Sequence, residues 1–142
     1  MSTKRDNLKE ICTRFGLQAL YAFGSRADEA AAFCSTGQAM ETGSQADLDL
    51  GVLSDTGRLL SASQRVELAL ALEDLFGVAR VDLVVMNEAS AFLALDIIDG
   101  ELLYARDRDS SARYELYVLR RAGDLAHFER MRRKHLLQGL VP

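Results

Sequence analysis

Short apolar runs alternate with longer amphipathic runs along this chain, and their order predicts its secondary structure. Apolar residues spaced three and four positions apart predict helices, whereas compact apolar runs of about four to eight residues predict strands. The predicted strands are Leu17–Phe23, Asp47–Leu53, Ala79–Met86 and Leu102–Tyr104. The predicted helices are one from Asp6 or Asn7 to Phe15, followed by Ala27–Phe33, Ser61–Phe76, Ala89–Ile98 and Ser110–Gln138.

The order of these elements predicts the fold class. Helices and strands alternate with short connections, which is typical of an α+β (α/β-like) domain with a mixed β-sheet flanked by helices, here with a long C-terminal helix. We expect a single domain over residues 1–142. The helix at 61–76 is dense enough in apolar residues to be well buried, and Gly123 could break or kink the last helix. The polar segment Ser35–Gln45 predicts a flexible loop, and 54–57 a turn.

Three carboxylates interrupt the apolar runs. Asp47 and Asp49 alternate along the second predicted strand, so their side chains project to the same face, about 7 Å apart. Asp82 lies in the third predicted strand, which would bring it beside them if the two strands are neighbours. An acid in an apolar strand is costly unless a ligand or metal ion neutralises it, although an isolated Asp-x-Asp also occurs by chance. Three clustered carboxylates are typical of a two-metal site, and oxygen ligands favour a hard cation such as Mg²⁺.

A glycine–serine turn, Gly24-Ser25-Arg26, follows the first predicted strand. Backbone N–H groups and a hydroxyl at such a turn, where a helix begins, can hold phosphates. Gly24 and Ser25 are therefore candidates for binding a nucleoside triphosphate. Arg26 either reaches a phosphate, the interpretation we favour, or forms an ion pair near the start of the helix. A phosphate-binding turn beside paired carboxylates indicates metal-assisted nucleotide chemistry.

Composition narrows the classes of function. The net charge of -4 argues against a general nucleic-acid binder, which usually carries a basic surface. The two cysteines are too few for a disulfide framework, and neither a signal-peptide core nor a membrane-length apolar run is found. We therefore expect a cytoplasmic protein without a membrane partner. His127 and His135 lack the spacing of zinc ligands and indicate surface histidines.

The turn and the carboxylates together carry a family resemblance. Gly24-Ser25-Arg26 followed by Asp47-x-Asp49 resembles the signature of the DNA polymerase β-type nucleotidyltransferase superfamily. The strand-borne Asp82, and the segment 97–104 followed by a helix with Arg and Tyr, are also similar to that family. The chain most resembles its minimal MNT-type members, the antitoxins of HEPN/MNT toxin–antitoxin pairs, over nearly its whole length.

The resemblance implies transfer of a nucleoside monophosphate, usually AMP, from a nucleoside triphosphate to a hydroxyl with the help of Mg²⁺. It implies that Gly24 and Ser25 hold the triphosphate of ATP and that Asp47, Asp49 and Asp82 hold two Mg²⁺ ions. Asp82 would lie on the side of the nucleophile and accept its proton. The acceptor would be a hydroxyl of a partner protein, a HEPN-type toxin. We also expect this chain to form a homo- or hetero-oligomer.

Two alternatives stay open from the sequence. The chain could be a non-catalytic module that neutralises a toxin by binding it, or an adenylyltransferase that acts on a small-molecule hydroxyl. The segment from Arg26 to Ala46 is longer than the family usually shows. Its polar loop could cover the site as a lid or occlude it.

The predicted last helix raises the question of a partner. One small domain does not readily cover a helix this long, so an exposed apolar stripe on it would mark an interface. The run Arg130–His135 is the most basic part of the chain and is either a solvated helix end or a docking surface for an acidic partner or RNA. Its R-x4-H spacing resembles the nuclease motif of HEPN toxins, but that motif needs a helical bundle for which this chain has no room.

Overall fold

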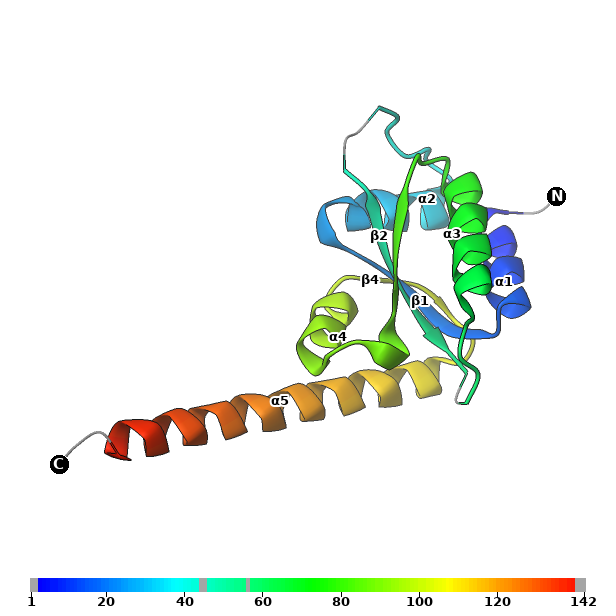
Figure 1. Ribbon diagram of the computed structural model, residues 1–142. Helices are drawn as coiled ribbons and strands as arrows, with labels where there is room; N and C mark the ends of the chain where they lie inside the picture. The colour runs from blue at the N-terminus through cyan, green and yellow to red at the C-terminus, as the bar shows by residue number, and fades with distance from the viewer. Residues whose placement is uncertain (1–2, 44–45, 56, 140–142) are drawn as a thin grey trace.

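The computed structural model describes residues 3–43, 46–55 and 57–139, and it confirms the predicted order of helices and strands (Figure 1). The elements are α1 (Lys4–Arg14), β1 (Leu17–Phe23), the 3-10 turn η1 (Gly24–Arg26), α2 (Ala27–Thr36), β2 (Leu48–Ser54), α3 (Ala62–Phe76), β3 (Val81–Val85), the 3-10 turn η2 (Met86–Glu88), α4 (Ala91–Ile98), β4 (Glu101–Ala105) and α5 (Arg108–Gly139).

The four strands form one mixed sheet in the order β3-β2-β1-β4, which confirms the predicted fold class. β1 runs antiparallel to both β2 and β4, whereas β2 and β3 are parallel. The parallel register places Asp49 directly opposite Asp82. The second and third strands are therefore neighbours, which was the condition for Asp82 to lie beside the acids of the second strand.

Helices cover both faces of the sheet (Figure 1). On one face, α1, α2 and α3 enclose a core to which β2 contributes Leu48, Leu50 and Val52. On the other face, α4 and α5 enclose a smaller core that includes Leu53. Gly51 lies between Leu50 and Val52 in β2. A Cβ at Gly51 would come within 2.6 Å of the Ile97 side chain, so glycine allows α4 to approach the sheet closely. The acids of β2 and β3 alternate with the first core and therefore project toward the α4 side.

The first helix begins earlier than predicted because its capping residue is Thr3, not Asp6 or Asn7. The Thr3 hydroxyl accepts a hydrogen bond from the backbone N–H of Asp6 at 3.1 Å, and the Thr3 N–H donates to the Asp6 carboxylate at 3.3 Å. This reciprocal pair is a capping box, which satisfies two backbone donors that a helix start otherwise leaves free. Asp6 thus supports the cap from inside the first turn.

Other boundaries shift by a few residues. α2 continues through Thr36 and ends where Gly37 adopts φ 77°, so the first residues of the predicted loop are helical. Residues 44 and 45 of that loop and Thr56 of the predicted turn lie outside the described residues. β3 is shorter than predicted, because Met86 enters η2. α4 begins at Ala91, where Ser90 caps it by accepting from the Leu93 N–H at 3.2 Å.

The burial predicted for α3 is only half right. Ser61 caps the helix and Gly77 ends it, so the predicted bounds differ from the observed ones by one residue at the start. The residues that face the sheet are buried, namely Leu68, Leu72 and Phe76. Val66 and Leu70, however, are 60% and 57% exposed, because they lie on the outer face of the helix. The helix covers the sheet with one face and is not enclosed.

α5 is longer than predicted and passes through Gly123 without a break. Its first turns are attached to the sheet, because the hydroxyl of the buried Tyr21 donates to a Glu115 carboxylate oxygen at 2.8 Å. Val118 and Ala122 are buried, but none of the side chains from 123 to 137 is. This part of the helix extends beyond the rest of the chain (Figure 1). No helix within the described residues is long and apolar enough to span a membrane.

Candidate active site

Two of the three predicted carboxylates face each other at one end of the sheet. Asp49 lies near the start of β2 and Asp82 near the start of β3, and the two residues are partners in the parallel register. Neighbouring strands lie about 4.8 Å apart, so side chains on the same face at paired positions are in contact range. Both acids project to the face that α4 covers farther along the sheet. The site is therefore open at this end.

Gly24 borders the same carboxylates. β1 ends at Phe23, whose register partner is Asp49, so the chain turns next to that acid. A Cβ on Gly24 would collide with the Oδ2 atom of Asp49, and Gly24 has φ 74°, a left-handed conformation that glycine adopts most readily. Any larger residue at position 24 would strain the turn and displace the carboxylate. Glycine is thus required by both the backbone and the space.

Burial and the neighbouring negative charges raise the pKa of Asp49. Burial is the largest cause, and the negative charge of Asp82, the negative charge of Asp47 and a hydrogen bond between the carboxyl groups of Asp49 and Asp82 add to it. The charged form is disfavoured because two like charges share a partly desolvated space. Such pairs are common at sites where a cation or a proton is held. The electrostatics therefore indicate that Asp49 and Asp82 form one functional unit.

Asp47, the third predicted carboxylate, lies just before β2 and contacts a different residue. It precedes β2 and its carboxylate lies 3.9 Å from the Arg80 guanidinium, with side-chain exposures of 41% and 80% for the acid and the base. The parallel register explains this contact, because it pairs Leu48 with Val81 and so places Asp47 beside Arg80. Arg80 is a neighbour of the site that was missed from the sequence. Only the register of two strands far apart in the chain could have identified it.

The carboxylates of Asp49 and Asp82 could provide two of the ligands of a divalent cation. Carboxylate oxygens are the ligands that hard cations such as Mg²⁺ prefer, and Asp49 and Asp82 supply them from adjacent strands. Across residues 3–43, 46–55 and 57–139, no three His, Cys, Asp or Glu side chains are grouped closely enough to hold a metal ion. Asp47, the third predicted ligand, has its carboxylate 3.9 Å from the Arg80 guanidinium.

The turn after β1 divides into an exposed and a buried part. Gly24 and Ser25 are exposed beside the carboxylates, as a phosphate-binding turn requires. Arg26 is 5% exposed, and its guanidinium donates to Glu29 at 3.1 Å and to the backbone carbonyl of Glu41 at 2.8 Å. The structure therefore shows the ion pair that was the alternative for Arg26. These bonds occupy most of its N–H donors, and a contact of Arg26 with a phosphate stays a prediction.

The fold and the site together define a class of protein. A mixed sheet with a glycine–serine turn at the end of its first strand and carboxylates on two neighbouring strands is the arrangement of a nucleotidyltransferase. The sequence profile of the family described as "Polymerase beta, Nucleotidyltransferase" matches residues 6–109. The chain belongs to this family, which confirms the resemblance inferred from its motifs. No curated protein sequence matches the chain significantly.

Solved structures of the same fold extend the comparison to α5. A chain from a mutant of the toxin–antitoxin MntA-HpeT aligns with a TM-score of 0.61 at 20% identity, covering 96% of this chain and 98% of that one. A chain from the tri-AMPylated Shewanella oneidensis HEPN toxin in complex with MNT antitoxin aligns with a TM-score of 0.59 at 18% identity, covering 98% and 97%. A chain from a toxin–antitoxin with AMP-PNP aligns with a TM-score of 0.57 at 21% identity, covering 96% and 98%.

Proposed function

We propose that this chain transfers AMP from ATP to a hydroxyl group of a partner protein, a HEPN-type toxin, and so acts as its antitoxin. The observation that carries this proposal is the convergence of Gly24, Asp49 and Asp82 at one end of the sheet, in a chain of the nucleotidyltransferase family. This is the place where a triphosphate and a divalent cation would meet. The fold allows both to enter, because Ser25 and Asp82 are exposed.

Each residue of the site has a part in the proposed reaction. The exposed backbone and hydroxyl of Gly24 and Ser25 would bind the triphosphate. Asp49 and Asp82 would hold Mg²⁺, with Asp47 as a further ligand once it leaves Arg80. Bound Mg²⁺ would neutralise charge on the attacking and leaving oxygens. A second ion is expected at the three carboxylates on the same chemical grounds.

The transfer step exchanges one phosphorus–oxygen bond for another. The acceptor oxygen forms a bond to the α-phosphorus of ATP, the bond from that phosphorus to the bridging oxygen of the β-phosphate breaks, and pyrophosphate leaves. Asp82 is the more exposed of the two paired acids and so is placed to accept the proton of the acceptor hydroxyl. Asp49, held between Gly24 and Asp82, orients the phosphate end of the site.

The identity of the partner is supported by the proteins with this fold. The Shewanella oneidensis complex contains an MNT antitoxin and a HEPN toxin that carries AMP, and another toxin–antitoxin structure contains AMP-PNP. The present chain aligns over nearly its whole length with a chain of each. A HEPN-type toxin is therefore the acceptor to test first. ATP is the corresponding donor.

The experiment is a transfer assay with ATP labelled in its α-phosphate. Purified chain, Mg²⁺ and a purified HEPN-type toxin of the same source organism are incubated with the label. We expect label on the toxin with the wild type and none with Asp49→Asn. The matched control is Asp74→Asn, which makes the same chemical change at an exposed position on α3 and should leave transfer unchanged. Equal labelling by Asp49→Asn would exclude the proposed site, and label found only on small hydroxylated acceptors would favour the small-molecule alternative.

A second candidate function is neutralisation of the toxin by binding alone. The observation that favours it is the Asp47–Arg80 contact, which leaves the described carboxylates short of a three-ligand group. Mg²⁺-dependent stabilisation by ATP separates the two functions. A competent site should gain about 2.7 kcal/mol of stability at a hundredfold excess of nucleotide over its Kd. A binding module without a working site should gain nothing.

A further inference from the structure

The outer part of α5, residues 123–137, extends beyond the rest of the described chain (Figure 1). None of its side chains is buried, whereas the inner part contributes Val118 and Ala122 to the interior. At 1.5 Å per residue it reaches about 22 Å beyond the last buried turn. A helical segment of this length is only marginally stable in water without tertiary contacts. We call this segment the outer helix.

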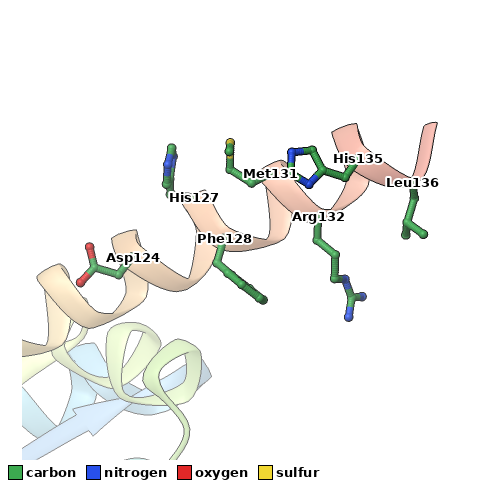
Figure 2. A pocket seen from close by; sticks show the side chains of 7 residues that line it. All are labelled: Asp124, His127, Phe128, Met131, Arg132, His135 and Leu136. Carbon is green, nitrogen blue, oxygen red and sulfur yellow. The ribbon is translucent and has the colours of Figure 1, made fainter. Parts of the chain in front are cut away.

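An apolar stripe continues along the outer helix from its buried inner face. Val118, Ala122, Leu125 and Leu136 lie on one face of the helix, so the face that packs on the body also extends outward. Between Leu125 and Leu136 this face carries the ion pair of Glu129 and Arg132. Leu125, Phe128 and Leu136 form what we call the outer stripe, and they are 39%, 62% and 60% exposed. Figure 2 shows Phe128 and Leu136 pointing to the same side of the helix.

The outer stripe borders a shallow pocket made by the outer helix alone. Its lining alternates apolar side chains with His127, Arg132 and His135 (Figure 2). Arg132 projects beside Phe128 and Leu136, and its ion pair within the described part of the chain is an exposed one with Glu129, at 3.5 Å. The stripe is thus flanked by a cation with a weak partner, which favours a negatively charged surface opposite it.

The charge of the outer helix differs in sign from that of the whole chain. Four of the five residues at 130–134 are Arg or Lys, and the only acids between 123 and 137 are Asp124 and Glu129. The chain as a whole has a net charge of -4. A surface complementary to the outer helix is therefore apolar along its centre and acidic at its rim.

We propose that the outer helix is the docking element of this chain, and that its outer stripe inserts into an apolar, acid-rimmed groove of the protein partner. This inference rests on the proposed function only for the identity of that partner, a HEPN-type toxin. A helix that presents apolar residues at i, i+3 and i+4 spacing to a groove is an established mode of protein recognition. In Figure 1, α5 passes the end of the sheet at which β2 finishes, whereas Asp49 lies near the start of β2. Binding and chemistry are thus assigned to separate parts of the chain.

A protein groove accounts for the outer helix better than RNA does. The exposed side chains of the stripe need an apolar partner, which a phosphate backbone does not provide. Helical spacing places Arg130 on the side away from Phe128, whereas Arg132 lies on the apolar side, so the basic run does not form one continuous surface for a strand of RNA. Pairing with the outer helix of a second copy would bring two basic runs close together, which like charges oppose.

The test measures binding of the full-length chain to a purified HEPN-type toxin of the same source organism by titration calorimetry. Leu136 and Leu137 form a matched pair, because they are adjacent leucines with exposures of 60% and 65% that face different sides of the helix. We expect Leu136→Ser and Phe128→Ser each to weaken binding by about tenfold, and Leu137→Ser to change Kd by less than about twofold. All three should keep the unfolding temperature of the wild type, because none of these side chains is buried.

The outcomes separate this inference from the proposed function. Equal effects of Leu136→Ser and Leu137→Ser, or none from either, would overturn the docking element even if AMP transfer occurs. Concentration-dependent self-association that depends on Phe128 would overturn it in favour of a second copy. Binding of an RNA oligonucleotide that is lost on Arg130→Glu but kept on Leu136→Ser would overturn it in favour of RNA. Stripe-dependent toxin binding without AMP transfer would support the docking element and refute only the transfer reaction.

Discussion

Replacing Asp49 by asparagine should stabilise the metal-free fold while it removes AMP transfer. Asp49 and Asp82 are like charges at paired positions of neighbouring strands, and such pairs cost roughly 0.2–1 kcal/mol. The substitution removes this repulsion at nearly constant volume. The new amide can also donate a hydrogen bond to the Asp82 carboxylate, which contributes about 1 kcal/mol. The free energy of unfolding should therefore rise by about 1 kcal/mol, and the unfolding temperature by about 2–4 °C for a chain of this size.

The sign of the pH dependence follows from the raised pKa of Asp49. In the folded chain its carboxyl group binds a proton more tightly than in the unfolded chain, where its pKa is near 3.8. Between the unfolded and the raised folded pKa, the folded state holds more protons, so stability falls as the pH rises through that window. The advantage of Asp49→Asn should be complete above the folded pKa. It should shrink as the pH is lowered toward the unfolded value.

The assay is thermal unfolding followed by circular dichroism, with EDTA present, at pH about 7 and at pH about 4. Asp74→Asn is the control for removing one negative charge from the chain at an exposed position. An Asp49→Asn variant that unfolds below the wild type at neutral pH would refute the reasoning, because the two carboxylates could then not oppose each other in the folded state. An advantage that stays constant with pH would refute the proposed origin in charge.

Three further substitutions test the residues that hold the turn, the loop and α5 in position. Gly24→Ala should cost about 1–2 kcal/mol from its left-handed backbone, measured by urea unfolding, and should abolish transfer because the methyl group displaces the Asp49 carboxylate. Tyr21→Phe should cost about 1 kcal/mol by the same method, because Glu115 loses its donor, and should speed hydrogen exchange in the first turns of α5. Arg26→Met should cost about 1–3 kcal/mol, because the partly exposed Glu29 and two backbone carbonyls lose their donor, and a loss of transfer without a loss of stability would indicate that Arg26 binds the nucleotide.

Local patterns in the sequence determined most of the fold. The apolar run of β1 was predicted with the boundaries that the structure shows, because it is bounded by Gly16 and Gly24. The bounds of α3 were likewise predicted to within one residue. The orientation of α3 could not be predicted, because its exposed face mixes the apolar Val66 and Leu70 with the polar Glu67 and Asp74. Periodicity identifies a buried face only when the other face is polar.

The candidate site was predictable where it depends on strand order and unpredictable where it depends on loops. The pairing of Asp49 with Asp82 needed only that two acid-bearing strands be neighbours. The contacts of Arg26 could not be predicted, because two of its acceptors are backbone carbonyls at Glu41 and Ala46, in a segment without a sequence pattern. The contact of Asp47 with Arg80 depended on register. Sequence periodicity cannot predict the contacts of a side chain whose partners lie in irregular or distant segments.

The weakness of the Asp47–Arg80 contact bears on whether the proposed site is an enzyme or only a binding surface. At 3.9 Å between exposed groups, such an ion pair contributes about 0–1 kcal/mol, so little opposes its release. A divalent cation between Asp49 and Asp82 would turn their repulsion into attraction and would draw the third carboxylate toward the same charge. On these energies the two-carboxylate arrangement can become a three-carboxylate site at small cost. Because Arg80 competes with the cation for Asp47, the affinity of the metal-free chain for Mg²⁺ should depend more on the Asp49–Asp82 pair than on this contact.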